Sequence, residues 1–447
     1  MSAPAGRTLG LTGLWGLLRR NADYRRLFGA TVVSFLGNWF GFVAVSGFVT
    51  EQTGSGGLAA VVFAAQVLPV FLAAPVAGVI ADRVDRRRLM VGVSCAAALP
   101  ALGLLVATAL EAPWLAIGCV ALIALCSAFF EPVTAAVVPR LVPRADLSLA
   151  QAAIGAVWGT MLFVGAALGG LAAATLGREA SYVLNALTFL IAAGFVLRIR
   201  TSLRPLGPVS TGTAGQVLRS QLVELGQFAR RRKLTRALLV TKTGVGLANG
   251  IVGLLPAFAI IRFGGDDAAI GVLLGARGVG ALVGPILGRA IARDDGRRLL
   301  LVCGGAILTY GVAYLFLPLI DSLAVAAVCV TLAHAGGGAQ WVLSTFGLQA
   351  STPDAIRGRV MSLDFGLATG AVGLSSLAAG GIAELVGLAA TSWMLVGVAL
   401  VYGVSWLAWT RDLWSAAEDP LREDPDDAAG EAARIDGADD EEGPALR

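Results

Sequence analysis

The chain has 447 residues, of which 56% are hydrophobic, 14% are charged and 58 are glycine. Its length alone would suggest two or three soluble domains. Apolar stretches of about 20 residues recur, however, and this is the length of helix that crosses the hydrocarbon core of a bilayer. The net charge is only +4, and the basic residues stand between the apolar stretches. The composition therefore indicates a polytopic membrane protein and gives no sign of nucleic-acid binding.

The apolar stretches predict an all-α membrane protein with twelve transmembrane helices, because such long runs satisfy their backbone hydrogen bonds in lipid only as helices. The predicted spans lie near residues 28–50, 57–81, 89–110, 113–138, 148–176, 179–197, 236–261, 268–291, 299–320, 322–350, 359–386 and 391–410. They divide the chain into a cytoplasmic N-terminal segment (1–27), a six-helix half (28–197), a cytoplasmic linker (198–235), a second six-helix half (236–411) and an acidic tail (412–447). We expect a basic amphipathic helix in the linker and disorder in the tail.

The distribution of basic residues predicts the orientation of the spans. All but four of the 34 Lys and Arg residues lie at the termini or after even-numbered spans, whereas the other connections carry mainly acids, namely Glu51, Glu111 and Asp321. Because cytoplasmic loops are enriched in Lys and Arg, both termini are placed in the cytoplasm. The preference for Arg over Lys, with abundant Ala and Gly, favours a GC-rich bacterial genome and hence the bacterial cell (plasma) membrane.

An internal repeat relates the two halves. The segment "AAPVAGVIADRVDRRRL" aligns without a gap with "VGPILGRAIARDDGRRL", 210 positions later. This offset pairs Asp85 with Asp295 and Arg87 with Arg297. Six spans per half give both halves the same orientation. Parallel repeats of this kind, with a site near the membrane midplane, are typical of secondary transporters.

The charged loop "GVIADRVDRRR" resembles the signature between spans 2 and 3 of the major facilitator superfamily, roughly G-x-x-x-D-R-x-x-R-[RK]. The matching residues are Gly78, Asp82, Arg83, Arg86 and Arg87. The topology and the repeat extend the resemblance over residues 20–411. The connections "VVPRLVPRADLSLAQA" and "STPDAIRGRVMS" are similar to those of the bacterial branch that includes enterobactin and macrolide exporters. The resemblance implies the major facilitator fold and export of a small molecule.

We predict that this loop is a gate. Gly78 lets a neighbouring helix approach closely, and Asp82 lies at the membrane boundary, where an unpaired carboxylate is costly. Asp82 is therefore expected to pair with a donor on the facing half and to latch the cytoplasmic side. Arg83, Arg86 and Arg87 would hold the loop at the anionic leaflet and pair with acids.

The alternative is that the run serves only as a topology anchor, which explains the arginines but neither the glycine nor the aspartate. In the second half, Ala292 stands at the position of Asp82. A latch there would have to use Asp294 or Asp295.

Ionisable residues inside the spans are the candidates for proton coupling. Glu131 lies about two turns from the cytoplasmic end of span 4, where a partly desolvated carboxylate can exchange protons, and Asp364 is similarly shallow in span 11. His334, the only histidine, can titrate near neutral pH and precedes "AGGG", a predicted hinge. For each residue the alternative is a structural hydrogen bond or ion pair with a neighbour.

In the resembled fold, spans 1, 4, 7 and 10 line the cavity. The predicted cavity residues are Asn38, Trp39, Phe42, Phe130, Lys242, Asn249, Arg277, Gln340 and Trp341. Arg277 lies too deep in span 8 to reach the interface and is expected to face the cavity or a carboxylate, whereas Lys242 has snorkelling as its alternative. Asn38 cannot titrate, although many proteins of the resembled branch carry an acid early in span 1.

Span 5 is rich in glycine, which predicts close packing against another helix. Its glycines are Gly155, Gly159, Gly165, Gly169 and Gly170. The run "GAALGG" resembles the antiporter signature G-P-x-x-G-G of the superfamily, with Ala166 in place of the proline.

We predict a secondary transporter that exports an amphipathic small molecule, such as a drug, macrolide or siderophore, by proton-coupled alternating access. The expected partners are this substrate, protons and the bilayer, for a monomer without cofactor or metal. An importer of a small metabolite with the same fold remains an alternative. A non-transporting scaffold acting through its tail is a further alternative, although it would need neither gate nor intramembrane charges. No P-loop, nucleophile or metal motif indicates an enzyme.

Overall fold

The computed structural model describes residues 11–204, 226, 228–230, 232–293, 295–416 and 419–421, apart from the side chains of Leu11, Asp82 and Ala355. Most of the predicted linker helix and of the acidic tail falls outside the described residues. Throughout the described ranges the secondary structure is helical and contains no strand.

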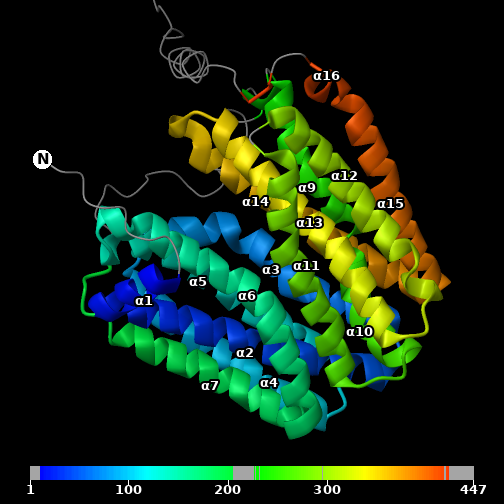
Figure 1. Cartoon of the computed structure of the whole chain (residues 1–447). Coiled ribbons are helices and arrows are strands. Elements are labelled where there is room, and N and C mark those ends of the chain that lie inside the picture. Colours follow the sequence, from blue (N-terminus) through cyan, green and yellow to red (C-terminus); the bar gives the residue numbers. More distant parts are fainter. Residues whose placement is uncertain are drawn as a thin grey trace, which may run out of the picture. The chain divides into compact units, whose positions relative to one another are not determined.

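The first seven helices follow one another with short connections (Figure 1). They are α1 (Leu11–Arg20), α2 (Ala22–Thr53), α3 (Gly56–Arg83), α4 (Arg86–Ala109), α5 (Pro113–Leu141), α6 (Arg144–Leu176) and α7 (Arg178–Leu197). The remaining helices are α9 (Lys233–Ala248), α10 (Gly250–Ala257), α11 (Asp267–Ala292), α12 (Gly296–Leu315), α13 (Leu323–Ser351), α14 (Asp354–Val386), α15 (Leu388–Trp409) and α16 (Arg411–Trp414). A π-helical turn (Phe258–Arg262) follows α10, and a 3₁₀ turn (Leu317–Leu319) follows α12.

Twelve helical segments of the described chain are long and apolar enough to cross a membrane, which confirms the predicted number of spans. Several helices extend beyond the apolar runs to a polar residue that caps their first turn. Asn21, for example, accepts a hydrogen bond from the N–H of Tyr24 (2.8 Å) and starts α2 six residues before the predicted span. The short helix α1 was not predicted, and its Leu17 packs into the same core as Leu27 and Val196.

Contacts between Cα atoms divide the chain into two compact units. The first unit comprises Met1–Thr211 and Val252–Gly278, and the second comprises Gly212–Ile251 and Val279–Arg447. Within the first unit, α2 packs on α6 and α7, and α4 packs on α5 and α7. Within the second unit, α9 packs on α14 and α15, and α12 packs on α13 and α15. These are the same neighbours shifted by the repeat, so the repeat seen in the sequence is also a repeat of packing. The predicted boundaries of the two halves stay a prediction.

The seventh span is broken, which the sequence analysis did not predict. Helix α9 ends at Ala248 and α10 begins at Gly250. Ser375 of α14 bridges the break, since its hydroxyl donates to the carbonyl of Leu247 and accepts from the N–H of Gly250 (3.0 Å). In lipid, an interrupted helix needs such substitutes for its lost backbone bonds. Broken spans are common at the binding sites of transporters.

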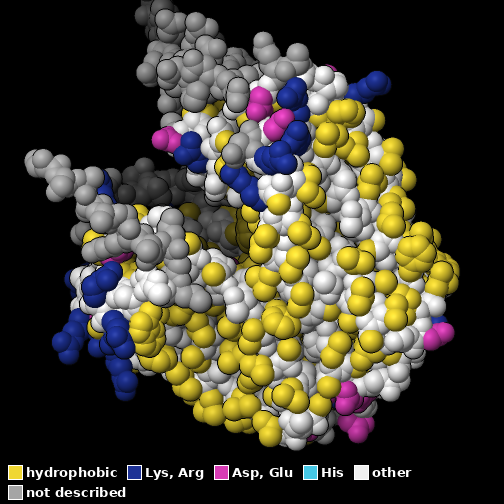
Figure 2. Space-filling view, in the orientation of Figure 1, with side chains coloured by type: hydrophobic (Ala, Val, Ile, Leu, Met, Phe, Trp, Pro, Cys, Tyr) yellow, Lys and Arg dark blue, Asp and Glu magenta, His cyan; other side chains and the backbone are white. Residues whose placement is uncertain are grey.

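The surface reflects the membrane environment. On the face drawn in Figure 2, hydrophobic side chains cover the sides of the helices, and Lys and Arg side chains gather near helix ends. Large apolar side chains such as Leu99, Leu385 and Val401 are exposed along the spans. In a soluble protein such exposure would be unfavourable, but against lipid it carries no penalty.

Candidate transport site

The signature loop between α3 and α4 is fixed by a helix cap. Asp85 Oδ1 accepts hydrogen bonds from the backbone N–H groups of Arg87 (2.9 Å) and Arg88 (3.2 Å) at the start of α4. The cap satisfies two N–H groups that have no partner inside the helix. The guanidinium of Arg87 donates to the carbonyl of Thr201 (2.8 Å), just after α7. The loop is therefore tied to the segment that leaves the sixth span.

The other predicted gating residues have different surroundings. Arg86 donates to backbone carbonyls of α3 and α5 at 3.3 and 3.4 Å. Arg83 is exposed at the end of α3. Among the described residues, no atom lies within 4 Å of the place that a side chain at Gly78 would take. The close helix approach expected there is absent from the described part, and the side chain of Asp82 lies outside it.

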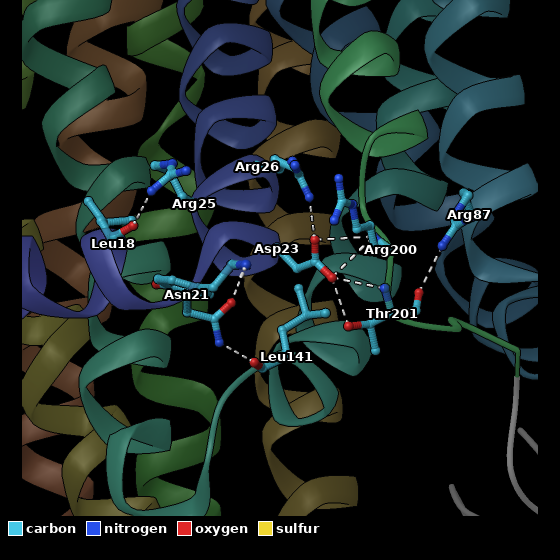
Figure 3. A network of polar contacts seen from close by, with 10 residues as sticks. Leu18, Asn21, Asp23, Arg25, Arg26, Arg87, Leu141, Arg200 and Thr201 are labelled. Atoms are coloured by element: carbon cyan, nitrogen blue, oxygen red, sulfur yellow. Dashed lines mark hydrogen bonds and ion pairs between the residues drawn. The ribbon is translucent and has the colours of Figure 1, made fainter.

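A network at the start of α2 reinforces this anchoring (Figure 3). Asp23 accepts from the guanidinium of Arg26 (2.6 Å), from the backbone N–H groups of Arg200 (3.1 Å) and Thr201 (2.8 Å), and from the Thr201 hydroxyl (2.8 Å). Thr201 thus bonds Asp23 with its N–H and hydroxyl and Arg87 with its carbonyl. Sequence reasoning missed Asp23, because a single aspartate in a basic segment carries no signal without its distant partners.

The second unit repeats this arrangement with its own residues. Asp295 caps α12 by accepting from the N–H groups of Arg297 (2.9 Å) and Arg298 (3.3 Å). Arg297 donates to the carbonyl of Ala416 (3.2 Å), and the N–H of Gly296 donates to Asp419 (3.0 Å). The segment after the twelfth span therefore holds this loop as the segment after the sixth holds the first. Asp294, the other acid considered for a latch, lies outside the described residues.

Glu131 is the carboxylate of α5, ten residues before the helix ends at Leu141. Its side chain is exposed, and no hydrogen bond or ion pair is formed to it within the described part of the chain. Pro132 follows it inside the helix and removes one backbone hydrogen bond of the preceding turn. Glu131 is therefore a carboxylate within a span that lacks a compensating charge among the described residues.

Lys242 and Asp364 form a buried ion pair between α9 and α14. Each residue is only 2% exposed. The ammonium of Lys242 also donates to the hydroxyl of Thr345 (2.8 Å) and lies 4.9 Å from the centre of the Trp341 ring, both on α13. Three of the predicted site residues thus come together. Lys242 does not snorkel to the interface, because its charge is satisfied inside the bundle.

Several buried polar side-chain atoms of α9, α13 and α14 lack a partner in the described structure. They are the Oδ1 atom of Asp364, the hydroxyl of Thr241 and both ends of the Gln340 amide, a residue with no exposed surface. Only Asp364 Oδ1 belongs to the ion pair itself. Native proteins leave few buried polar atoms unsatisfied, so this free oxygen is suited to binding water or a ligand.

Asn249 and His334 belong to a second polar group in the same unit. Asn249 sits at the break of the seventh span and accepts from the hydroxyl of Tyr310 (2.9 Å). His334 Nε2 and the hydroxyl of Tyr314 are 3.0 Å apart, and the rings of Tyr310 and Tyr314 pack edge to face. Both predicted residues are buried. The two tyrosines that organise them lie on α12 and were not predicted.

In the first unit, aromatic residues form a continuous row. Trp39 packs on Phe42 with ring centres 5.8 Å apart, and Phe42 packs on Phe63 at 6.0 Å. The guanidinium of Arg277 lies 5.7 Å from the centre of the Phe63 ring, a distance that allows a cation–π contact. Arg277 therefore meets an aromatic face, and its predicted role in the cavity stays a prediction.

Two further predicted cavity residues differ from each other in burial. Asn38 is half-buried on α2, while Phe130 is buried among apolar side chains of the first-unit core. Phe130 consequently contributes to packing.

An ion cluster lies at the ends of the spans opposite the signature loop. Arg178, the first residue of α7, makes a two-point contact with Asp267 at the start of α11 (2.8 and 3.0 Å) and also binds Glu51 near the end of α2 (2.8 Å). All three residues belong to the first unit. The sequence held one signal for this cluster, since Arg178 is a rare basic residue in an acidic connection.

The glycines of α6 allow the close packing predicted from the sequence. A Cβ atom on Gly170 would lie 2.6 Å from the Cα of Gly271, and one on Gly165 would lie 2.6 Å from the ring of Trp39. At these two positions only hydrogen fits between the neighbouring groups. Gly155 is different, because nothing described lies within 4 Å of its missing side chain.

No three His, Cys, Asp or Glu side chains of the described ranges gather as a metal site would require.

The sequence model of the transmembrane secretion effector family matches residues 12–425 of this chain.

Two relatives are similar along most of their length. The multidrug efflux pump Tap of Mycolicibacterium fortuitum is 27% identical over 390 residues, which cover 84% of this chain and 92% of that protein. The pump of the same name in Mycobacterium tuberculosis (strain ATCC 25618 / H37Rv) is 28% identical over 372 residues, covering 81% and 87%.

Solved structures with the same fold include a POT family transporter in complex with a thioalcohol-conjugated peptide, with a TM-score of 0.67 and 13% identity over 87% of this chain and 96% of that one. They also include the nucleoside transporter NupG, with a TM-score of 0.63 and 11% identity over 87% and 99%. At these identities the likeness concerns the fold alone.

Proposed function

The chain belongs to the transmembrane secretion effector family of major facilitator transporters, and from that membership we propose that it exports an amphipathic small molecule in exchange for protons. The direction of transport is supported by the relatives, which are named multidrug efflux pumps and match more than four fifths of this chain. The amphipathic character of the substrate is supported by the aromatic row of the first unit. We take the chain as a monomer of the bacterial membrane with both termini in the cytoplasm.

The observation that carries proton coupling is the solitary carboxylate of Glu131. It lies inside α5, roughly 15 Å from the end of the helix at Leu141, with no ion pair among the described residues. Keeping an uncompensated charge in the membrane costs several kcal/mol, so this side chain favours its neutral form when it faces lipid or a closed cavity. When the cavity opens to water, solvation stabilises the charged carboxylate of Glu131, and the proton can leave.

The other two candidates for proton coupling, Asp364 and His334, already interact with other side chains of the protein. Asp364 is held by Lys242, and His334 shares a hydrogen bond with Tyr314. The carboxylate of Asp364 thus already binds a cation of the protein itself. Glu131 is therefore the residue that we assign to proton transfer in this proposal.

The signature loops support alternating access in a specific way. In each unit a capping aspartate and an arginine fasten the loop to the segment that follows the last span of that half. Each loop would then move with its own unit as a rigid piece. We propose that Asp82 acts in the cytoplasmic gate, in the loop that this anchoring holds.

The proposal is tested in proteoliposomes that have an acidic interior and contain a pH-sensitive dye. Candidate amphipathic drugs and siderophores are added outside, and the loss of the pH gradient is recorded for the wild type, Glu131→Gln and Glu111→Gln. Glu111 lies in the connection between α4 and α5 and its carboxylate accepts from Gln52 (3.2 Å), so it is the matched control outside the hydrocarbon. We expect substrate-dependent proton release from the wild type and from Glu111→Gln, and none from Glu131→Gln.

Two results would overturn the proposal. If Glu131→Gln releases protons as the wild type does, the coupling residue is wrong. If vesicles with the native, right-side-out orientation accumulate the substrate inside, the protein is an importer and not an exporter.

A further inference from the structure

We infer that Asp364 and Trp341 form the binding site for the positively charged group of an organic-cation substrate, and that the ammonium of Lys242 occupies this site while no substrate is bound. The inference deepens the proposed function, on which it rests, by naming a substrate class. It concerns the second unit alone, where α9, α13 and α14 supply all the residues involved.

The surroundings of the Lys242 ammonium are those that recognise an organic cation. A carboxylate (Asp364), a hydroxyl (Thr345, 2.8 Å) and an indole face (Trp341, 4.9 Å to the ring centre) meet at one nitrogen atom. Aromatic faces beside an anionic group attract ammonium ligands strongly when water is excluded. In the described structure, the cation at this place is the ammonium of Lys242, a side chain of the protein itself.

Lys242 does not use up the polar groups at this place. The second carboxylate oxygen of Asp364 is buried without a partner, and the residue is only 2% exposed. A group kept only to neutralise a lysine would be expected to have both oxygens satisfied, since each unsatisfied buried atom lowers stability. The remaining oxygen is suited to a polar ligand.

Stability does not explain the presence of the pair either. Burying two charges costs more than their attraction returns in many proteins, and apolar replacements are often neutral or stabilising. Ionisable residues inside transmembrane segments commonly mark a substrate or ion pathway. The lysine stem is flexible, so its ammonium can leave the carboxylate without movement of α9, and the break at Asn249 gives the span further freedom.

The inference predicts a characteristic pattern of binding for a permanent cation. The probe is tetraphenylphosphonium, and its uncharged comparator is triphenylphosphine oxide, which has a similar shape. Binding to the purified full-length protein in detergent is measured for the wild type, Lys242→Met, Asp364→Asn and the double variant Lys242→Met/Asp364→Asn. The double variant keeps the pair neutral, so it reports on the site even if Asp364→Asn alone fails to fold.

We expect Lys242→Met to bind tetraphenylphosphonium about tenfold or more tightly than the wild type, because the internal competitor is gone. The double variant should lose this gain and bind the cation more weakly than the wild type. Binding of triphenylphosphine oxide should change less than about twofold in every variant.

Trp341→Leu should weaken cation binding, whereas Trp409→Leu should not. Trp409 is a suitable control, because it also faces a lysine, Lys233, with 5.8 Å between the ammonium and the ring centre.

Either of two outcomes would overturn the inference: Lys242→Met binding the cation no better than the wild type, or the double variant binding it as well as the wild type. Such a failure would leave the proposed function intact if Glu131→Gln still abolished substrate-dependent proton release. Conversely, cation binding with the predicted pattern but without any proton release would support the site and refute the coupling.

Discussion

Equivalent places in the two units carry different charges. The repeat aligns Glu131 with Trp341, Val32 with Lys242 and Ile154 with Asp364, and the helices that bear them have the same neighbours in each unit. The first unit thus holds one carboxylate flanked by apolar residues, while the second holds a neutral pair beside an aromatic ring.

This difference suggests a division of labour between the units. A lone carboxylate in the membrane gains from binding a proton, because the neutral form avoids the cost of the charge. A carboxylate with a resident ammonium can exchange one cation for another. Equivalent regions of the two halves have therefore acquired the two properties that an exporter of cations in exchange for protons requires.

The largest expected effect comes from breaking the neutral pair of the second unit. Asp364→Asn leaves a buried ammonium without its counter-ion, and we expect a loss of about 3–5 kcal/mol in the free energy of unfolding. The double variant Lys242→Met/Asp364→Asn should recover most of this loss. Thermal unfolding of the purified protein in detergent checks both values. If Asp364→Asn is as stable as the wild type, Asp364 does not compensate a buried charge on Lys242.

The second prediction transfers the pair into the first unit. Val32→Lys places an ammonium at the repeat position of Lys242, on α2, which packs against the helix of Glu131. An interaction of about 1.4 kcal/mol with the ionised carboxylate would make its proton about tenfold harder to bind. Substrate-dependent proton release in proteoliposomes should then fall by a similar factor. Val32→Met, of similar length but uncharged, is the control and should keep most of the activity; equal activity of both variants would contradict the comparison.

The smallest effect concerns the capped loop of the second unit. Hydrogen bonds from the Arg297 side chain and from the N–H groups of Arg297 and Arg298 hold the pKa of Asp295 below its ordinary value. Its contribution to stability is therefore present at neutral pH and is lost as the pH falls through the acid range below that value.

We expect Asp295→Asn to lower the unfolding temperature by a few degrees at most at about pH 7, and the difference from the wild type to shrink near pH 3. Arg297→Gln should also lower the unfolding temperature at about pH 7, by less than Asp295→Asn does, and this difference from the wild type should also shrink near pH 3. A gap that stays constant with pH would exclude the proposed role of the carboxylate charge.

The sequence predicted the number of spans, because a run of about 20 apolar residues has no stable state in lipid other than a helix. It also predicted the repeat, since shared ancestry remains visible in Asp85, Arg87 and their partners at a constant offset. Gly165 and Gly170 of α6 were correctly linked to close packing. These features depend on composition and on neighbours along the chain, which a sequence displays directly.

Only the tertiary structure decided which polar residues meet. Lys242 and Asp364 are 122 positions apart in the chain, and nothing in either span indicates the other. The same holds for Asp23 with Thr201 and for Arg178 with Asp267. Helix packing sets such pairs, because it brings together faces whose register depends on every contact along two helices. The sequence therefore determined that charges inside the spans must be satisfied, and the packing determined that Asp364 has a partner while Glu131 has none among the described residues.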